Sequence, residues 1–338
     1  YVKGDLKQVI AASNLPDDPA LGGELARVFP VPLVERFGEA LQAHQLRREI
    51  IATRVANDLV DHVGITFVDR LRQSTGASVS AVALAYLIAR DVFNVDQHWC
   101  AIEQLDNRIP ATLQVQMMNE LARLVRRASR WLLRNRRSEL NVRDHMTRFT
   151  RAVQEMVANL PDYLGQAARD EWQARHAELN EQGVPDALAR VVAGAGYLYT
   201  ALGIVEAQEA TGMPLAQVAR VYYTLGERLE LTWFARAISK LAPSGHWQAL
   251  ARESYREDLD WQQRSLTVGV LRQADNVEDL DGLLDGWMNQ HASLVERWKQ
   301  MLAEFRGIRD PEYAMFSVAL RELLDLAQST AHGIASVG

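Results

Sequence analysis

The sequence predicts an all-α protein, a multi-helix assembly of about a dozen helices with orthogonal or bundle-like packing and no β-sheet of note. Sustained alternation of apolar and polar residues, the pattern of a half-buried strand, is absent. The apolar fraction of 48% and the charged fraction of 24% are those of an ordinary globular protein with a sizeable core. Apolar residues recur at helical spacing almost throughout, and one such row consists of Ile51, Val55, Leu59, Val63 and Phe67.

Turn-forming residues mark where the predicted helices begin and end. Ser78 stands before an apolar run, as a helix N-cap does, and Pro214 and Pro311 suit the first turn of a helix. Pro161 is the best candidate for a boundary between two helical subdomains, 1–160 and 161–338, although helices on either side can share one core. In chain order, breaks are expected at 74–76, around Pro110, at 161–165, at 183–185, at 242–245 and near Gly307. Their irregular spacing argues against a repeat solenoid.

The longest uncharged run covers residues 191–205, between Arg190 and Glu206. It is shorter than the roughly 20 apolar residues that span a bilayer, so we expect a buried core helix and no membrane partner. Within it, Gly194-Ala195-Gly196 begins like a dinucleotide-binding fingerprint, but Tyr199 occupies the position of the third glycine. We therefore expect close helix packing at these two glycines rather than a cofactor site.

Other tests for chemistry are negative. Gly-Lys followed by Ser or Thr, which a P-loop needs, does not occur, and residues 76–80 miss the serine-hydrolase elbow by one residue, so Ser78 is interpreted as a cap. Asp58 and His62 lie one helical turn apart and could share a metal, but a hydrogen-bonded or solvated pair is the favoured interpretation, and we assign no metal. Cys100 is the single cysteine, so no internal disulfide is possible and a reducing cytoplasm fits.

Lysine is rare. A site that uses several lysines to bind an anionic substrate and activate water could hardly be assembled from so few, and we assign no catalytic residue and no cofactor-binding residue to this chain. The four lysines are Lys3, Lys7, Lys240 and Lys299.

The most unusual feature is a series of arginines on one side of a single predicted helix, opposite a side of apolar residues. We call this series the arginine face; it consists of Arg123, Arg126, Arg127, Arg130, Arg134 and Arg137. The opposite side carries Leu121, Leu124, Val125, Ala128 and Leu132. Three interpretations remain open: a solvated face with local carboxylate partners, a docking face for an acidic protein, and a nucleic-acid site. Sparse aromatic residues and the net charge of -6 disfavour nucleic acid.

Several short motifs follow one another from the first residue. They are Tyr1-Val2-Lys3, Asn14-Leu15-Pro16-Asp17-Asp18-Pro19, Val28-Phe29-Pro30, residues 46–53 (LRREIIAT), Val55-Ala56-Asn57, Gly64-Ile65-Thr66-Phe67, Thr75-Gly76-Ala77-Ser78 and Ala89-Arg90-Asp91-Val92-Phe93, and more loosely residues 225–229 and 246–250. With them the chain resembles the large bacterial NAD-dependent glutamate dehydrogenases, in the helical region that follows their catalytic domain. The resemblance covers most of the chain and is most specific up to Phe93.

The resemblance implies a cytoplasmic, multidomain homo-oligomer that oxidises L-glutamate to 2-oxoglutarate while reducing NAD. The nicotinamide-binding glycines and catalytic lysines of that family lie upstream of the part matched, and the absence of an initiator methionine suggests a cut in a longer chain. The leading hypothesis is a C-terminal structural or regulatory region that packs on the catalytic domain of the same chain or on other subunits. The alternative is a free-standing helical interaction module that docks an acidic partner through the arginine face.

Overall fold

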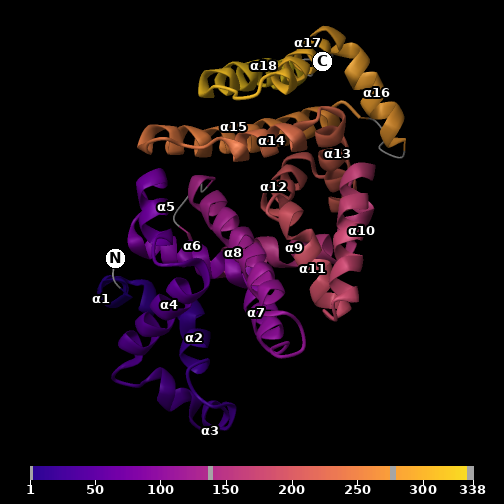
Figure 1. Ribbon diagram of the computed structural model, residues 1–338. Coiled ribbons are helices and arrows are strands. Elements are labelled where there is room, and N and C mark those ends of the chain that lie inside the picture. The colour runs from indigo at the N-terminus through magenta and orange to yellow at the C-terminus, as the bar shows by residue number, and fades with distance from the viewer. Residues whose placement is uncertain (1–2, 136–139, 275–278, 333–338) are drawn as a thin grey trace. The chain divides into compact units, whose positions relative to one another are not determined.

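The computed structural model describes residues 3–135, 140–274 and 279–332 (Figure 1). In these ranges the regular structure consists of α-helices and two short 3-10 turns, η1 (Leu15–Asp17) and η2 (Pro19–Leu21), with no strand. The predicted all-α class is confirmed. Every predicted break lies at or between helix ends, although Pro161 itself lies inside the last turn of a helix that ends at Tyr163.

The number of helices is larger than predicted, because the described residues form eighteen α-helices rather than about a dozen. Some of the additional breaks occur at residues that are neither glycine nor proline. Asn94 and Glu230 adopt left-handed backbone conformations, with φ of 52° and 55°, and each ends one helix and starts another. Asparagine adopts positive φ more readily than most non-glycine residues, but glutamate rarely does, so the sequence gives no signal for the break at Glu230.

The chain divides into two compact units, Tyr1–Val157 with Arg175–Tyr199, and Ala158–Ala174 with Thr200–Gly338. The expected division was 1–160 and 161–338. The first unit instead ends its initial segment at Val157 and also includes Arg175–Tyr199. Its helices are α1 (Lys3–Ala12), α2 (Gly22–Ala26), α3 (Val31–Gln42), α4 (Arg47–Val63), α5 (Phe67–Thr75), α6 (Val79–Val92), α7 (Val95–Glu103), α8 (Ala111–Arg134) and α11 (Asp186–Leu198). Helices α9 (Val142–Tyr163) and α10 (Gln166–Glu181) contribute residues to both units.

The core of the first unit is built around α6, which packs against α8, α5, α1 and α7. The Ser78 hydroxyl caps α6 by accepting a hydrogen bond from the Ala81 amide at 3.2 Å, as the sequence predicts. The apolar row of α4 is buried, and so is the apolar side of α8. Helical spacing therefore identified the core-facing sides of both helices correctly.

The second unit contains α12 (Ala201–Thr211), α13 (Leu215–Arg228), α14 (Leu231–Lys240), α15 (His246–Arg272), α16 (Leu280–Gln290), α17 (Ala292–Gly307) and α18 (Tyr313–His332). Helices α15 and α18 lie side by side along much of their length (Figure 1). Beside them, Phe234, Trp298, Phe305 and Phe316 form an aromatic cluster with ring centroids 5.1 to 5.9 Å apart. This cluster joins α14, α17 and α18.

Among the described residues, no single helix has the length and apolar composition to cross a membrane. Two consecutive pairs, α5 with α6 and α11 with α12, reach that length and composition only as pairs with a bend between them. The run 191–205 is mostly buried, as expected, but it is divided between α11 and α12 rather than forming one helix.

Candidate functional site: a buried ion cluster and an adjacent pocket

Arg126 and Arg130 of the arginine face donate hydrogen bonds to residues at the ends of neighbouring helices. Arg126 donates two hydrogen bonds to the backbone oxygen of Val63, at 3.2 and 3.0 Å, and so closes the C-terminal end of α4. Arg130 donates to the Ser74 hydroxyl at 2.6 Å, near the end of α5. These two side chains therefore connect α8 to the ends of α4 and α5.

The rest of the arginine face is more accessible. Arg123, Arg127 and Arg134 are exposed, and the Arg127 guanidinium lies 4.5 Å from the centre of the Tyr199 ring. Arg137 lies outside the described residues. Docking of an acidic partner on this face stays a prediction.

A buried ion cluster, which sequence reasoning did not predict, lies at the centre of the first unit. It consists of Arg90 on α6, Asp58 on α4, Glu24 on α2 and Asp91 at the end of α6. Arg90 is fully buried, donates to Asp58 Oδ2 at 2.8 Å and to Asp91 Oδ1 at 2.8 Å, and also pairs with Glu24. The Tyr86 hydroxyl donates a further bond to Asp58 Oδ2 at 2.8 Å. One guanidinium thus holds three helices together.

Burial and neighbouring charges shift the pKa values of Arg90 and Tyr86. Burial by itself lowers the pKa of Arg90, but the negative charges of Asp91 and Glu24 outweigh it and raise that pKa above its usual range. Burial raises the pKa of the Tyr86 hydroxyl, and the negative charge of Asp58 raises it further, so Tyr86 remains a donor.

The partners of Arg90 are distant in sequence, at separations of 32 residues for Asp58 and 66 for Glu24. Their pairing therefore could not be read from helical spacing. The available signal was the arginine itself, which stands near the end of the apolar run 79–92 where a solvated charge is not expected. Arg90 and Asp91 also belong to the motif at residues 89–93, and the ion cluster gives these two residues a structural role.

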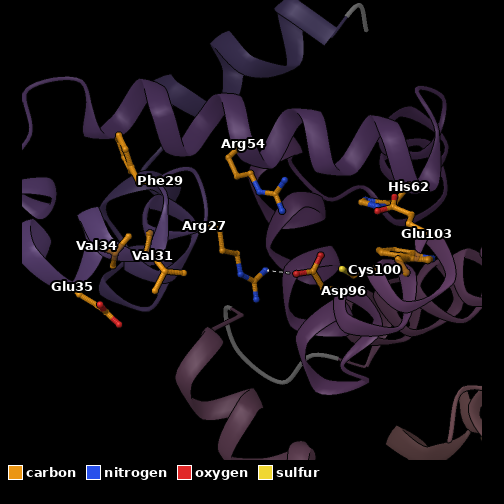
Figure 2. Close-up of a pocket in the computed structure, with 12 residues that line it drawn as sticks. Arg27, Phe29, Val31, Val34, Glu35, Arg54, His62, Asp96, Cys100 and Glu103 are labelled. Carbon is orange, nitrogen blue, oxygen red and sulfur yellow. Dashed lines mark ion pairs between the residues drawn. The ribbon is translucent and has the colours of Figure 1, made fainter. Parts of the chain in front are cut away.

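Two further arginines surround the ion cluster and face an open pocket. Arg27 Nη1 lies 3.1 Å from Glu24 Oε1 and 3.2 Å from Asp96 Oδ2, and Figure 2 marks the pair with Asp96. Arg54 lies 3.9 Å from Glu24 and 3.8 Å from Asp58, which is too far for a hydrogen bond. In the described part of the chain, the buried Nε of Arg54 has no hydrogen-bond partner.

His62 contacts the ion cluster through Asp58 and also lines the pocket. Its Nδ1 lies 3.0 Å from Asp58 Oδ1 and 3.0 Å from the Asp58 backbone oxygen, and its ring stacks on Trp99 at a centroid distance of 4.0 Å. Burial alone lowers the pKa of His62, but the hydrogen bond and charge of Asp58 raise it above the usual value. For Asp58 burial acts in the opposite direction and raises the pKa, but His62 and Arg90 hold that pKa well below its usual range. The direct contact agrees with the hydrogen-bonded pair that the sequence favoured.

The raised pKa of His62 predicts a pH dependence of stability. Because the folded state binds this proton more tightly than the unfolded state, the contribution is fully present below the unfolded pKa of about 6.5 and is lost as the pH rises through the higher folded pKa. Urea unfolding of the chain from about pH 5.5 to 9 should therefore show a decline in stability that His62→Gln removes. The exposed His246 supplies the control His246→Gln, which should retain the decline. An unchanged slope in His62→Gln would contradict this assignment.

The pocket has a cavity volume of about 650 Å3 and presents two kinds of surface. Phe29, Val31 and Val34 supply an apolar wall, and Figure 2 shows them across the pocket from Arg54 and His62. The remaining lining residues are Ala26, Arg27, Glu35, Asp96, Trp99, Cys100 and Glu103. Side chains of both charges beside an apolar wall suit the binding of a ligand or of another protein segment.

Cys100 contributes a thiol to the lining of the pocket. The exposed Cys100 thiol accepts a hydrogen bond from Gln104 Nε2 at 3.7 Å, whereas a base that activated this thiol would have to accept its proton. No group of three or more His, Cys, Asp or Glu side chains among the described residues could hold a metal ion.

The two glycines of the fingerprint-like run lie within α11, not at a turn between a strand and a helix. Gly194 is buried, but Gly196 is exposed and an added Cβ there would meet no atom within 4 Å. Close packing at Gly196 was therefore a wrong expectation. The close approach in this stretch occurs at Gly203, where an added Cβ would lie 2.5 Å from Cδ of Arg264.

Comparisons with known proteins agree on one family. Residues 1–325 match the family model described as "Glutamate dehydrogenase, C-terminal". The chain is 47% identical over 334 residues to the NAD-specific glutamate dehydrogenase of Pseudomonas aeruginosa, covering 99% of this chain and 21% of that protein. The corresponding enzymes of Halomonas elongata and Mycobacterium tuberculosis are 41% and 31% identical over 97% and 99% of this chain, and over 20% of each enzyme.

The chain thus spans about one fifth of the length of these relatives. The matched region runs through both units and includes the ion cluster, the pocket and the arginine face. This chain belongs to the C-terminal helical region of the large NAD-specific glutamate dehydrogenases.

Proposed function

We propose that the chain is a non-catalytic part of an NAD-specific glutamate dehydrogenase and that it packs on the catalytic domain of the same chain or on neighbouring subunits. The whole enzyme would convert L-glutamate, NAD and water to 2-oxoglutarate, ammonium and NADH, in the cytoplasm and as a homo-oligomer. NAD and glutamate would be bound by the portion that precedes residue 1. The observation that carries the proposal is the 47% identity, which covers nearly all of this chain but 21% of the relative.

The chemistry of the chain supports a structural role. The most buried charged groups, Arg90, Asp58 and Glu24, are engaged with one another and connect helices. The sequence has four lysines, two of which lie in α1. The described polar groups are therefore arranged to stabilise a helical scaffold.

A split enzyme tests this proposal. The portion that precedes residue 1 and the present chain would be produced together as two separate polypeptides, with the preceding portion alone as the control. We expect the two to copurify and glutamate-dependent NAD reduction to require the preceding portion, while the present chain alone gives none. NAD reduction by the present chain alone would overturn the non-catalytic assignment, and failure to copurify would overturn the packing role.

The arginine face supports a second candidate function, docking of an acidic protein surface. Its exposed members Arg123, Arg127 and Arg134 are the relevant positions, because Arg126 and Arg130 also support the fold. Replacing Arg123 and Arg127 with glutamine should make the association of the split enzyme weaker and less sensitive to salt. Unchanged affinity and unchanged salt sensitivity would rule this surface out.

A further inference from the structure

An apolar surface remains uncovered on the first unit, around α3. Twelve large apolar side chains are exposed in the described chain, and five of them lie within residues 28–46. They are Val28, Val31, Leu33, Phe37 and Leu46, with exposed fractions of 46, 67, 43, 45 and 56%. Such a concentration is typical of an interaction surface rather than of scattered surface residues.

Within the described chain, the apolar residues of helix α3 are not buried. None of its twelve residues is buried, although isolated helices of about that length are marginal in water and depend on packing of an apolar face. Its helical conformation is interrupted at Phe37, where φ is -126° and ψ is 21°. The end of α3 is held by polar contacts, in which the Gln42 amide donates to the Gly22 oxygen and accepts from Arg47, each at 3.3 Å. Helix α3 packs against α2, but that packing buries none of its apolar residues.

The same surface continues into the pocket. Val31 and Val34 of α3, with Phe29 before it, form the apolar wall that faces Arg54 and His62 across the cavity (Figure 2). Because the pocket is open, a side chain that projects from a docked segment could enter it. The Arg54 side chain lines the pocket and is 31% exposed, so it would offer such a segment a polar contact.

The length of the relatives indicates what covers this surface. About four fifths of each relative lies outside the region that matches this chain, and the family is the C-terminal part, so that portion precedes residue 1. Helix α1 packs on α4, which begins directly after residues 28–46, so the point where the chain enters the first unit is on the same unit as α3. A partner tethered there has a high effective concentration, and a small surface is then sufficient for docking.

A second copy of the chain fits the surface less well. Stable homodimer interfaces usually bury about 2,000 Å2 or more and are more continuously apolar. Here the exposed apolar residues are confined to one twelve-residue helix and the residues that flank it, which is a small surface for such an interface.

We propose that the apolar surface of residues 28–46, with its adjoining pocket, docks on the portion of the same dehydrogenase chain that precedes residue 1. This inference rests on the proposed function and names the surface through which the packing occurs.

Photochemical cross-linking in the intact dehydrogenase tests this assignment. A benzophenone amino acid would replace Phe37 or Val31, and, as matched exposed controls, Val115 on α8 or Val318 on α18, which are 60% and 57% exposed. Active enzyme would be irradiated and the cross-linked peptides mapped, with mixed isotope-labelled and unlabelled subunits to separate links within one chain from links between chains. We expect positions 31 and 37 to link to residues that precede residue 1 of the same chain, at a yield well above that of the controls.

Other outcomes contradict the assignment in distinguishable ways. Links from positions 31 and 37 to another subunit, or to another part of this C-terminal region, would identify a different occupant. If 31 and 37 gave no link while a control position linked to the preceding portion, this surface would be excluded but the proposed packing role would stand. Absence of any link from all four positions would count against both.

A second test measures how a substitution in the apolar surface changes the affinity between the two polypeptides of the split enzyme. Phe37→Gln should weaken the association of the two polypeptides by about tenfold or more, as expected for an aromatic residue in the centre of an interface. Val318→Gln should leave the affinity unchanged. Because Phe37 is exposed in this chain, its replacement should not unfold the first unit. Equal affinities for the two variants would overturn the proposal.

Discussion

Replacing Arg90 with alanine should lower the free energy of unfolding of the chain by about 3–5 kcal/mol. The guanidinium is fully buried and pairs with Asp58, Glu24 and Asp91, which come from three helices. Its removal would leave the carboxylates of Asp58 and Glu24 buried without their main positive partner, and that desolvation cost is larger than the net contribution of the intact pair. Urea unfolding followed by circular dichroism measures the change.

The design of this experiment separates charge from packing. Arg90→Met retains much of the side-chain volume but removes the same positive charge from Asp58 and Glu24, so it should be nearly as destabilising as Arg90→Ala. Adding Glu24→Gln and Asp58→Asn to Arg90→Met should recover part of the loss, because the buried negative charges are then absent. Arg123→Ala on the exposed side of α8 should stay within about 0.5 kcal/mol of the unmodified chain. A loss below about 1 kcal/mol for Arg90→Ala would show that the ion cluster is not a main support of the first unit.

Replacing Trp298 with alanine should cost a similar amount, about 3–5 kcal/mol, in the second unit. The indole is fully buried, packs edge-to-face on Phe234 with a centroid distance of 5.3 Å, and donates to the backbone oxygen of Leu229 at 2.8 Å. Leu229 directly precedes Glu230, whose left-handed conformation ends α13 and starts α14. Trp298 therefore fills the aromatic core and also satisfies a carbonyl at the junction of two helices.

A cavity and an unsatisfied carbonyl would both result from Trp298→Ala, and Trp298→Phe should restore most of the packing but not the hydrogen bond. The expected order of stability is unmodified, then Phe, then Ala. Trp247, which is 81% exposed, provides the control, and Trp247→Ala should change stability by no more than about 0.5 kcal/mol. Equal losses at positions 298 and 247 would contradict the packing described for this cluster.

The fold class and the core-facing sides of long helices could be predicted from sequence because both depend on local spacing. The buried row of α4, the buried side of α8 and the Ser78 cap are examples. The number of helices could not be predicted in the same way. Asn94 and Glu230 separate consecutive helices by adopting left-handed backbone conformations, which spacing alone does not reveal. The division of residues 191–205 between two helices could not be predicted either, because no proline or charged residue marks the break.

Some functional features could also be predicted from the sequence, whereas others depend on how the helices pack. The family could be suggested from short motifs, and the comparisons place the chain in it. The ion cluster could not be assembled from sequence, because Asp58 and Glu24 are tens of residues away from Arg90 and meet it only after α2, α4 and α6 have packed. The arginine face was found by spacing alone, but its contacts to Val63 and Ser74 depend on where the ends of α4 and α5 lie.

The most direct test of the central claim is capture of the native protein from its source cells with an antibody against this region, followed by measurement of chain length and of glutamate-dependent NAD reduction. We predict activity on a chain several times longer than 338 residues, with no activity in the 338-residue chain purified alone. A captured chain of about 338 residues without dehydrogenase activity would contradict the account and would favour a free-standing helical interaction module.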